Sequence, residues 1–247
     1  MGSGARVGAN LAGDGAVVRA VIVDLDDTLY PQSSWLAGAC DAVAACAALE
    51  GVDEASMRQA LSAALADGSD SGRVIDRALE LAGASHIDIR PLLAVFGEHA
   101  PGRLPTYPGV LEALEYLSAR VPIGLVTDGA PAGQQAKLDA TGAGAYVSVV
   151  VFSDELGREH RKPDPTPFVR ALETLGVAPE DAVMVGDRPD KDIEGASRAG
   201  MRALRVRTGE FASSPDHPLT WAVADDFPAA CRLLRPLLAG RSGELGC

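Results

Sequence analysis

Five short, almost continuous apolar runs constrain the fold of this chain more than any other feature of its sequence. The runs are residues 17–25, 122–127, 146–152, 181–187 and 201–206. A continuously apolar strand is typical of a parallel sheet that is covered on both faces. Segments with helical patterns separate the runs, so the sequence predicts an α/β fold with a doubly wound, Rossmann-like parallel sheet.

One long insertion interrupts this alternation. From residue 33 to residue 105 the strand signal disappears, and Ala- and Leu-rich segments punctuated by Gly, Ser and Asp take its place. This pattern predicts an all-helical subdomain and not a disordered linker. We therefore expect an α/β core at 17–32 and 106–238, a helical cap subdomain at 33–105, a disordered N-terminal tail at 1–16 and a flexible C-terminal tail at 239–247.

The charge balance limits the partners of such a protein. The formal net charge is −12, so the clustered basic residues of a nucleic-acid or anionic-membrane surface are not expected. No segment approaches the roughly 18 apolar residues of a membrane span. The four cysteines show neither zinc-site spacing nor a secreted disulfide framework, and the start of the chain lacks the apolar core of a signal peptide. We expect a cytoplasmic protein with reduced thiols and no nucleic-acid or membrane partner.

Three carboxylates follow the first apolar run directly. Asp24, Asp26 and Asp27 lie in the stretch VIVDLDDTLY. Like charges repel one another, and holding them together costs free energy unless a cation or a protonated member relieves the repulsion. Such a cluster is therefore either solvated or functional.

Further polar residues follow later apolar runs, at the edge where open α/β sheets place their ligand sites. They are Thr127, Asp128 and Gly129 in LVTDG, Lys162 in HRKPDPTPF, and Asp187 and Asp192 in VGDRPDKDIEGA. Together with the acidic cluster, and in this order, these motifs resemble the haloacid dehalogenase superfamily, specifically its phosphatases with a helical cap inserted after the first strand. The resemblance covers residues 18–235.

The resemblance implies a role for each motif residue. Asp24 is the nucleophile that forms an aspartyl-phosphate, and Asp26 protonates the leaving group and then accepts a proton from the attacking water. Lys162 bridges the nucleophile and the phosphate. Thr127 donates its hydroxyl to a phosphoryl oxygen, together with nearby backbone amides of the Asp128–Gly129 turn.

The same resemblance implies Mg²⁺ as the cofactor. Asp24, Asp187 and the backbone carbonyl of Asp26 supply oxygen ligands, and phosphate and water complete the coordination. Asp192, five positions after Asp187, orients the metal ligands or waters from outside.

The roles of several neighbouring residues are open at this point. Asp27 either takes part directly or shapes its loop through hydrogen bonds, and Asp190 either supports the metal ligands or is a solvated loop acid. Asp128 stands where relatives commonly carry Asn, so we expect its carboxylate to point away from the phosphate or to be held by a hydrogen bond. We expect Lys137 and Gln135 to be packing and surface residues of the following helix.

The motifs together imply a phosphatase that hydrolyses a small phosphomonoester, with a sugar or polyol phosphate favoured. A haloacid dehalogenase needs neither an acid at position 26 nor Mg²⁺, so Asp26 and Asp187 count against that chemistry. A sugar phosphomutase keeps all four motifs and remains an alternative. A non-catalytic binding or regulatory protein of the same fold is a second alternative, although the first motif is intact here. The sequence leaves the natural substrate and the choice between monomer and homodimer open.

Overall fold

The computed structural model describes residues 17–66, 68–69 and 72–239, which form two compact units. One unit contains the chain up to Gln32 and from Arg103 onward, and the other is Ser33–Gly102. Residues 103–105, expected in the cap, therefore belong to the first unit, where the amide of Leu104 donates to the carbonyl of Ala140 at 3.0 Å.

The two expected tails fall almost entirely outside the described residues. This applies to the N-terminal tail at 1–16 and to the C-terminal tail from residue 240. At residue 239 the expectation of a flexible tail is wrong, because the amide of Ala239 donates to the carbonyl of Val18 at 2.8 Å. This bond ties Ala239 to the first unit.

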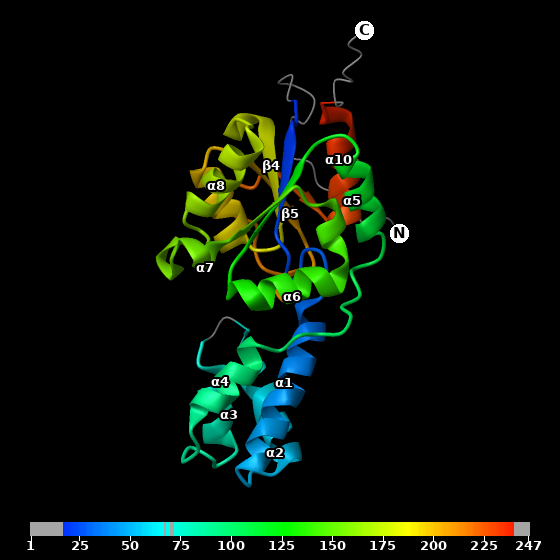
Figure 1. Ribbon diagram of the computed structural model, residues 1–247. Helices are drawn as coiled ribbons and strands as arrows, with labels where there is room; N and C mark the ends of the chain where they lie inside the picture. The colour runs from blue at the N-terminus through cyan, green and yellow to red at the C-terminus, as the bar shows by residue number, and fades with distance from the viewer. Residues whose placement is uncertain (1–16, 67, 70–71, 240–247) are drawn as a thin grey trace. The chain divides into compact units, whose positions relative to one another are not determined.

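Six parallel strands form the sheet of the first unit, in the order β3-β2-β1-β4-β5-β6 (Figure 1). The strands are β1 (Ala20–Val23), β2 (Ile123–Thr127), β3 (Val149–Phe152), β4 (Ala182–Gly186), β5 (Arg202–Val206) and β6 (Ala222–Ala224). Every residue of the central strands β1, β2 and β4 is buried. The predicted doubly wound sheet is confirmed, and its winding reverses beside β1, where such sheets place their ligand sites.

One strand of the sheet, β6, was not predicted from the sequence. β6 has three residues and pairs with Leu204–Val206 at the edge of the sheet. Asp225 and Asp226 follow it directly, so the apolar run is too short to stand out from its polar surroundings.

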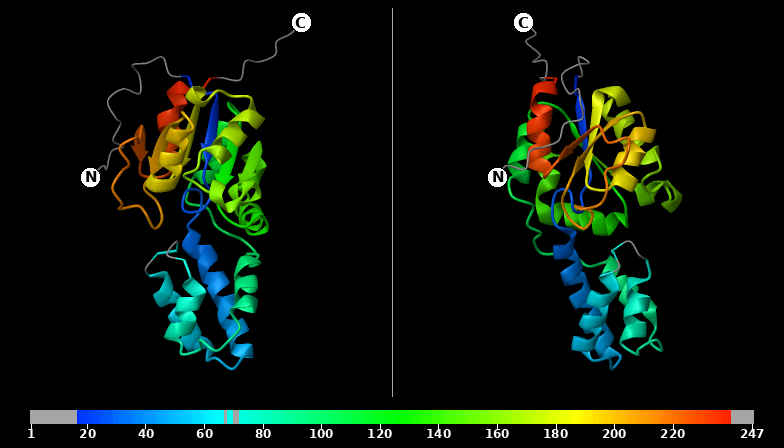
Figure 2. Two further views of the ribbon diagram at one scale, coloured as in Figure 1. Left: turned by 90° about the vertical axis from the view of Figure 1, so that its left-hand side faces the viewer. Right: turned by 180° about the vertical axis from the view of Figure 1, so that it is seen from behind.

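Helices cover both faces of the sheet. They are α5 (Val110–Ser118), α6 (Pro131–Thr141), α7 (Ser153–Leu156), α8 (Thr166–Leu175), α9 (Glu194–Arg198) and α10 (Phe227–Leu234). Phe168 of α8 and Ala196 of α9 share one buried cluster with Ile22 and Met184 of the sheet. Helices α5 and α10 lie together on the opposite face (Figures 1 and 2).

Local sequence chemistry sets the ends of several of these helices. The carboxylate of Asp226 accepts a hydrogen bond from the amide of Ala229 at 2.7 Å and caps α10. Pro131 begins α6, where its missing N–H needs no partner. Short helical turns complete the unit: η1 (Ala143–Tyr146), η2 (Arg158–His160), η3 (Pro179–Asp181), η5 (Arg235–Leu237) and the π-helical segment η4 (Pro189–Ile193).

The second unit is helical, as expected. Its helices are α1 (Gln32–Leu49), α2 (Glu54–Leu65), α3 (Val74–Leu81) and α4 (Ile89–Gly97). Met57, Leu61, Leu79 and Leu92 are buried in a core of their own, which is why the Ala- and Leu-rich segments fold as a subdomain. In the part of the chain that the structure describes, no helix is long and apolar enough to cross a membrane.

Candidate active site

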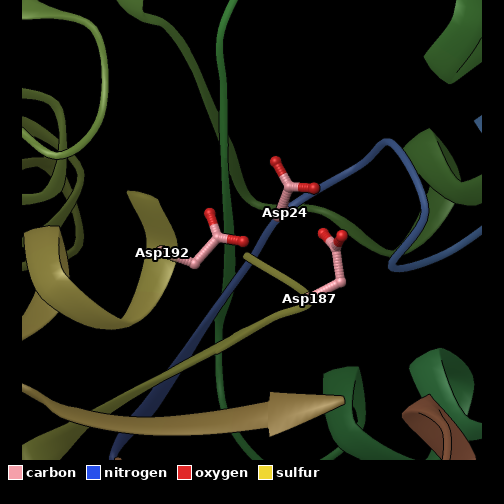
Figure 3. A group of neighbouring side chains, drawn as sticks. All are labelled: Asp24, Asp187 and Asp192. Carbon is pink, nitrogen blue, oxygen red and sulfur yellow. The ribbon is translucent and has the colours of Figure 1, made fainter. Parts of the chain in front are cut away.

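Three carboxylates converge at the carboxyl edge of the sheet. Asp24 follows β1, Asp187 follows β4, and Asp192 lies on the next turn. Their ligand oxygens lie within 4.8 Å of one another, and Figure 3 shows the three carboxylates grouped together. Strands β1 and β4 pair in parallel with Val23 opposite Val185. The parallel register therefore brings Asp24 and Asp187 side by side.

A π-helical turn brings Asp192 into this group. In η4 the amide of Ile193 donates to the carbonyl of Arg188, five positions earlier, at 3.2 Å. The turn also carries Asp192 close to the backbone of Gly186, where an added Cβ would lie 2.3 Å from a carboxylate oxygen of Asp192. Position 186 therefore needs glycine. Segments of π-helix are frequently found at functional sites.

Lys162 places a positive charge among these carboxylates. Its Nζ donates to Asp24 Oδ1 at 2.5 Å and to Asp192 Oδ1 at 2.8 Å, and its side chain is only 4% exposed. Burial alone would lower the pKa of Lys162, but the charges of Asp192 and Asp24 outweigh it and raise this pKa well above its usual value. Lys162 is therefore a cation throughout the physiological pH range.

The carboxylates remain electrostatically unfavourable despite this lysine. Burial raises the pKa of Asp24 to about 7, and although Lys162 opposes the shift, the charges of Asp192 and Asp26 add to it. Burial and the charges of Asp192 and Asp24 also raise the pKa of Asp187 well above its usual value. A bound divalent cation would favour the ionised forms and relieve the repulsion.

This donor set fits Mg²⁺. Hard divalent cations bind carboxylate oxygens, and the group of three supplies them in one buried place. Both oxygens of Asp192 accept from the protein, from Lys162 Nζ and from the amide of Arg188 at 3.0 Å. Asp24 and Asp187 are therefore better suited to bind the ion, and Asp192 is better suited to orient Lys162 and the loop.

Thr28 supports Asp187 and was not predicted to be a site residue. Its hydroxyl is fully buried and donates to Asp187 Oδ1 at 3.3 Å. The available signal was its position directly after Asp27, within the first motif. Asp190, by contrast, has a side chain that is 62% exposed and pairs with Arg188 at 2.9 Å, which favours the loop-acid interpretation.

Asp128 is held by hydrogen bonds, which is one of the two outcomes expected from the sequence. Its Oδ1 accepts from the hydroxyl of Ser153 at 2.7 Å and from the amide of Lys162 at 3.1 Å. It follows Thr127, which is buried at the carboxyl end of β2. These bonds tie the loop after β2 to the segment that carries Lys162.

Gly129 completes this loop in a conformation that favours glycine. Its φ is +125°, and a Cβ there would lie 2.8 Å from Nε2 of Gln134. The same amide group of Gln134 donates to the backbone carbonyl of Asp128. Because Gly129 has no side chain, the backbone between Thr127 and α6 can pack closely against the side chain of Gln134.

The carboxylate of Asp26 has a separate set of partners. Lys137 Nζ lies 3.0 Å from both of its oxygens, Gln134 Nε2 donates to Oδ2 at 3.1 Å, and the hydroxyl of Tyr30 donates to Oδ1. Lys137, expected to be a packing or surface residue, is not on the surface, because its side chain is buried in an ion pair with Asp26. Gln135 is on the exposed side of α6 and donates to Asp139.

Asp27 shapes its loop. Its φ is +56°, a left-handed conformation that is unfavourable for most residues but tolerated by Asp. Its carboxylate accepts from the amides of Gln32 at 2.8 Å and Glu210 at 3.1 Å, and its backbone carbonyl accepts from Thr208. These bonds join the loop after β1 to the loop after β5, which favours the loop-shaping interpretation over a catalytic one.

Comparison with known proteins places this site in a family. A family model described as haloacid dehalogenase-like hydrolase matches residues 18–200. The chain is 38% identical over 204 residues to a glyceraldehyde 3-phosphate phosphatase of Methanopyrus kandleri, covering 79% of this chain and 86% of the relative. It is 33% identical over 221 residues to a phosphoglycolate phosphatase of Rhodospirillum rubrum, covering 85% and 88%.

A solved structure shares the architecture as well. The 2-haloacid dehalogenase from Pseudomonas syringae pv. Tomato aligns with a TM-score of 0.63 and 27% sequence identity, covering 89% of this chain and 99% of that chain. The family match spans both the strand that precedes Asp24 and the segment that carries Asp187 and Asp192. The chain therefore belongs to the haloacid dehalogenase-like hydrolase family.

Proposed function

We propose that this protein is a Mg²⁺-dependent phosphatase that hydrolyses a small phosphomonoester through an aspartyl-phosphate on Asp24. A phosphate monoester dianion repels nucleophiles, so the reaction needs a positioned attacker and positive charge on the phosphoryl oxygens. The convergence of Asp24, Asp187 and Lys162 in one buried place carries the proposal. It combines a nucleophile, a cation and carboxylate ligands for a metal ion.

In the first step, an oxygen of Asp24 forms a bond to phosphorus while the bond from phosphorus to the leaving oxygen breaks. Lys162 holds Asp24 Oδ1, which fixes the orientation of the carboxylate. Asp26, protonated when substrate is bound, gives its proton to the leaving oxygen, and the carboxylate that this leaves is paired with Lys137. Thr127 and the amides of the Asp128–Gly129 turn donate to the phosphoryl oxygens.

In the second step, Asp26 takes a proton from a water molecule that attacks the phosphorus of the aspartyl-phosphate. The bond between phosphorus and Asp24 breaks, inorganic phosphate leaves, and both carboxyl groups return to their starting states. One residue therefore acts first as an acid and then as a base. A dehalogenase would leave Asp26 and Asp187 without a function, which is why we favour phosphate chemistry despite the dehalogenase neighbour.

The residues that would hold Mg²⁺ are Asp24, Asp187 and the backbone carbonyl of Asp26. When bound, the ion neutralises charge on the phosphoryl oxygens. The raised pKa values of Asp24 and Asp187 support this assignment, because they indicate a site that is unfavourable without a cation. Asp192 orients Lys162.

The names of the relatives favour a compact substrate. One relative is named for glyceraldehyde 3-phosphate and another for phosphoglycolate, and both compounds are small phosphomonoesters. A net charge of −12 opposes long polyanions. We therefore propose a sugar phosphate, a polyol phosphate or a related compound of two or three carbons. The free thiols of Cys40, Cys46 and Cys231 are compatible with a reducing, cytoplasmic setting.

The test is hydrolysis of phosphomonoesters by the purified protein, with and without a metal chelator. We expect release of inorganic phosphate in Mg²⁺ and loss of activity in excess chelator. Asp24→Asn should abolish turnover, whereas Asp190→Asn, at the exposed loop acid, should not. Undiminished activity in chelator contradicts the metal assignment. Isomerisation of a sugar phosphate without release of phosphate favours the phosphomutase alternative, and no turnover of any phosphate ester favours a binding protein.

A further inference from the structure

The carboxylate of Asp26 is held from two directions. Tyr30, four positions along the same loop, donates to Oδ1, and Gln134 of α6 donates to Oδ2 at 3.1 Å. Lys137, one turn further along α6, lies 3.0 Å from both oxygens. Donors on both oxygens fix the plane of the carboxylate as well as its position.

Packing alone does not account for a lysine at position 137. The side chain of Lys137 is 6% exposed, and burying an ammonium group is costly unless an opposite charge compensates it. A methionine would fill similar space without that cost. The ion pair with Asp26 is therefore the feature of this position that requires a lysine.

The use of lysine in the chain points the same way. The sequence has only three lysines among 22 basic residues, namely Lys137, Lys162 and Lys191. Each has a carboxylate partner at this end of the sheet: Asp26 for Lys137, Asp24 and Asp192 for Lys162, and Asp128 at 4.0 Å for Lys191. The other basic residues are arginines. The compact ammonium of a lysine is therefore found only where it can form an ion pair with a carboxylate beside the site.

We propose that Lys137 is a positioning residue for the reaction. Its ammonium holds the carboxyl group of Asp26 in line with the leaving oxygen of the substrate. The inference rests on the proposed phosphatase function. Asp26 touches the reacting atoms and Lys137 acts through it. Tyr30 and Gln134 assist, and α6 thereby becomes part of the catalytic apparatus.

The chemistry predicts where this positioning matters. Transfer of the proton from Asp26 to the leaving oxygen is most needed when that oxygen is a poor leaving group, as in an alkyl phosphate. A nitrophenolate leaves without much help. A displaced Asp26 should therefore slow the cleavage of alkyl phosphates and leave the cleavage of 4-nitrophenyl phosphate nearly unchanged, whereas general damage to the site should slow both equally.

The experiment compares Lys137→Met with Gln135→Met, a matched control on the exposed side of the same helix. The value of kcat/KM, which reports formation of the aspartyl-phosphate, is measured in Mg²⁺ for 4-nitrophenyl phosphate, phenyl phosphate and glycerol phosphate. We expect Lys137→Met to lower kcat/KM for glycerol phosphate by about 10- to 100-fold and for 4-nitrophenyl phosphate by less than about threefold. Gln135→Met should match the wild type.

A double-mutant cycle tests whether Lys137 acts through Asp26. Lys137→Met introduced into an Asp26→Asn protein should change kcat/KM for glycerol phosphate by less than about twofold, because the group it positions is already absent. If Lys137→Met does not fold, Lys137→Gln serves in the same cycle, since it removes the charge that pairs with Asp26 and keeps a polar side chain.

The outcomes separate this inference from the proposed function. An equal loss for all three substrates, or losses that multiply in the Asp26→Asn background, overturns the role of Lys137 while the phosphatase assignment stands. A wild-type protein that cleaves none of the substrates overturns both. A loss selective for poor leaving groups that disappears without the carboxyl group of Asp26 supports both.

Discussion

The ammonium of Lys162 contacts the carboxylate of Asp24 across 138 positions of sequence, and both side chains are almost completely buried. An isolated buried charge is strongly unfavourable, so each of these groups depends on the other. The contact occupies one oxygen of Asp24 and leaves the other for the proposed attack. One ion pair therefore contributes to the stability of the core and to the geometry of the proposed nucleophile.

Replacing Lys162 by methionine should lower both activity and stability. The change leaves Asp24 and Asp192 without their cation, and removing one partner of a buried ion pair typically costs about 3–5 kcal/mol. We expect a loss of kcat of at least about 100-fold and a clear fall in the midpoint of urea unfolding. Lys191→Met is the matched control, because the side chain of Lys191 is 26% exposed and its contact with a carboxylate oxygen of Asp128 is 4.0 Å long. Similar losses in the two variants would contradict the role of Lys162.

Replacing Thr28 by valine should weaken Mg²⁺ binding. Valine has nearly the same shape but cannot donate the hydrogen bond that orients Asp187, a proposed metal ligand. The Mg²⁺ concentration for half-maximal activity should rise by about tenfold or more, with a smaller change in kcat at saturating Mg²⁺. Thr174→Val, in an exposed helix position, should leave the metal dependence unchanged. An unchanged Mg²⁺ requirement in Thr28→Val would show that this hydrogen bond does not orient the ligand.

The stability of the metal-free protein should fall as the pH rises from 5 to 8. The pKa of Asp24 is about 7 in the folded protein, against an ordinary value of 3.8. Between these values the folded state holds a proton that the unfolded state has released. The contribution to stability is therefore complete below about pH 4 and is lost as the pH rises through about 7. Urea unfolding in chelator at several pH values measures this slope.

Two comparisons isolate the origin of that pH dependence. Asp24→Asn removes the titrating group, so its unfolding free energy should fall less steeply between pH 5 and 8. Excess Mg²⁺ should also flatten the slope for the wild type, because the cation favours the ionised carboxylates. A wild-type slope of the opposite sign in chelator would mean that Asp24 is ionised in the metal-free protein.

Asp27 should matter for stability more than for the chemical step. Asp27→Ala loses the hydrogen bonds to Gln32 and Glu210 and places alanine at φ +56°, so we expect a loss of about 2–4 kcal/mol. Asp27→Gly relieves the backbone strain and should cost less than Asp27→Ala. Urea unfolding measures the stability of the two variants and so tests this order. The kcat of the folded fraction should stay within about tenfold of the wild type, which is less than the effect of losing a general acid or base. A loss of kcat as large as that of Asp24→Asn would instead make Asp27 catalytic.

The sheet was predictable because its central strands are buried on both faces. A strand such as β4 (Ala182–Gly186) has no exposed side, so its apolar run is visible without knowledge of its partners. The edge strand β6 has three residues and was missed. The order of the strands follows from long-range pairing, which the periodicity of one segment does not encode, and it was not predicted from the sequence.

The site was predictable where a motif follows a strand directly. Asp24 and Asp187 meet because β1 and β4 are neighbours and parallel, and parallel strands end at the same edge of the sheet. Lys137 was misjudged for a physical reason. A polar residue on a helix is normally solvated, and its inward direction depends on how α6 packs against the loop that carries Asp26. Such a contact joins residues 111 positions apart and leaves no local pattern.

Trapping the covalent intermediate shows whether the reaction passes through an aspartyl-phosphate on Asp24. The wild type and Asp26→Asn are mixed with a phosphorus-32-labelled substrate in Mg²⁺, quenched in acid during turnover and digested. We predict a hydroxylamine-labile label on the peptide that contains Asp24. More label should accumulate in Asp26→Asn if the loss of the base slows hydrolysis of the aspartyl-phosphate more than its formation. No label should appear in Asp24→Asn or in excess chelator. Turnover that continues in Asp24→Asn, or a label on another residue, would contradict this prediction.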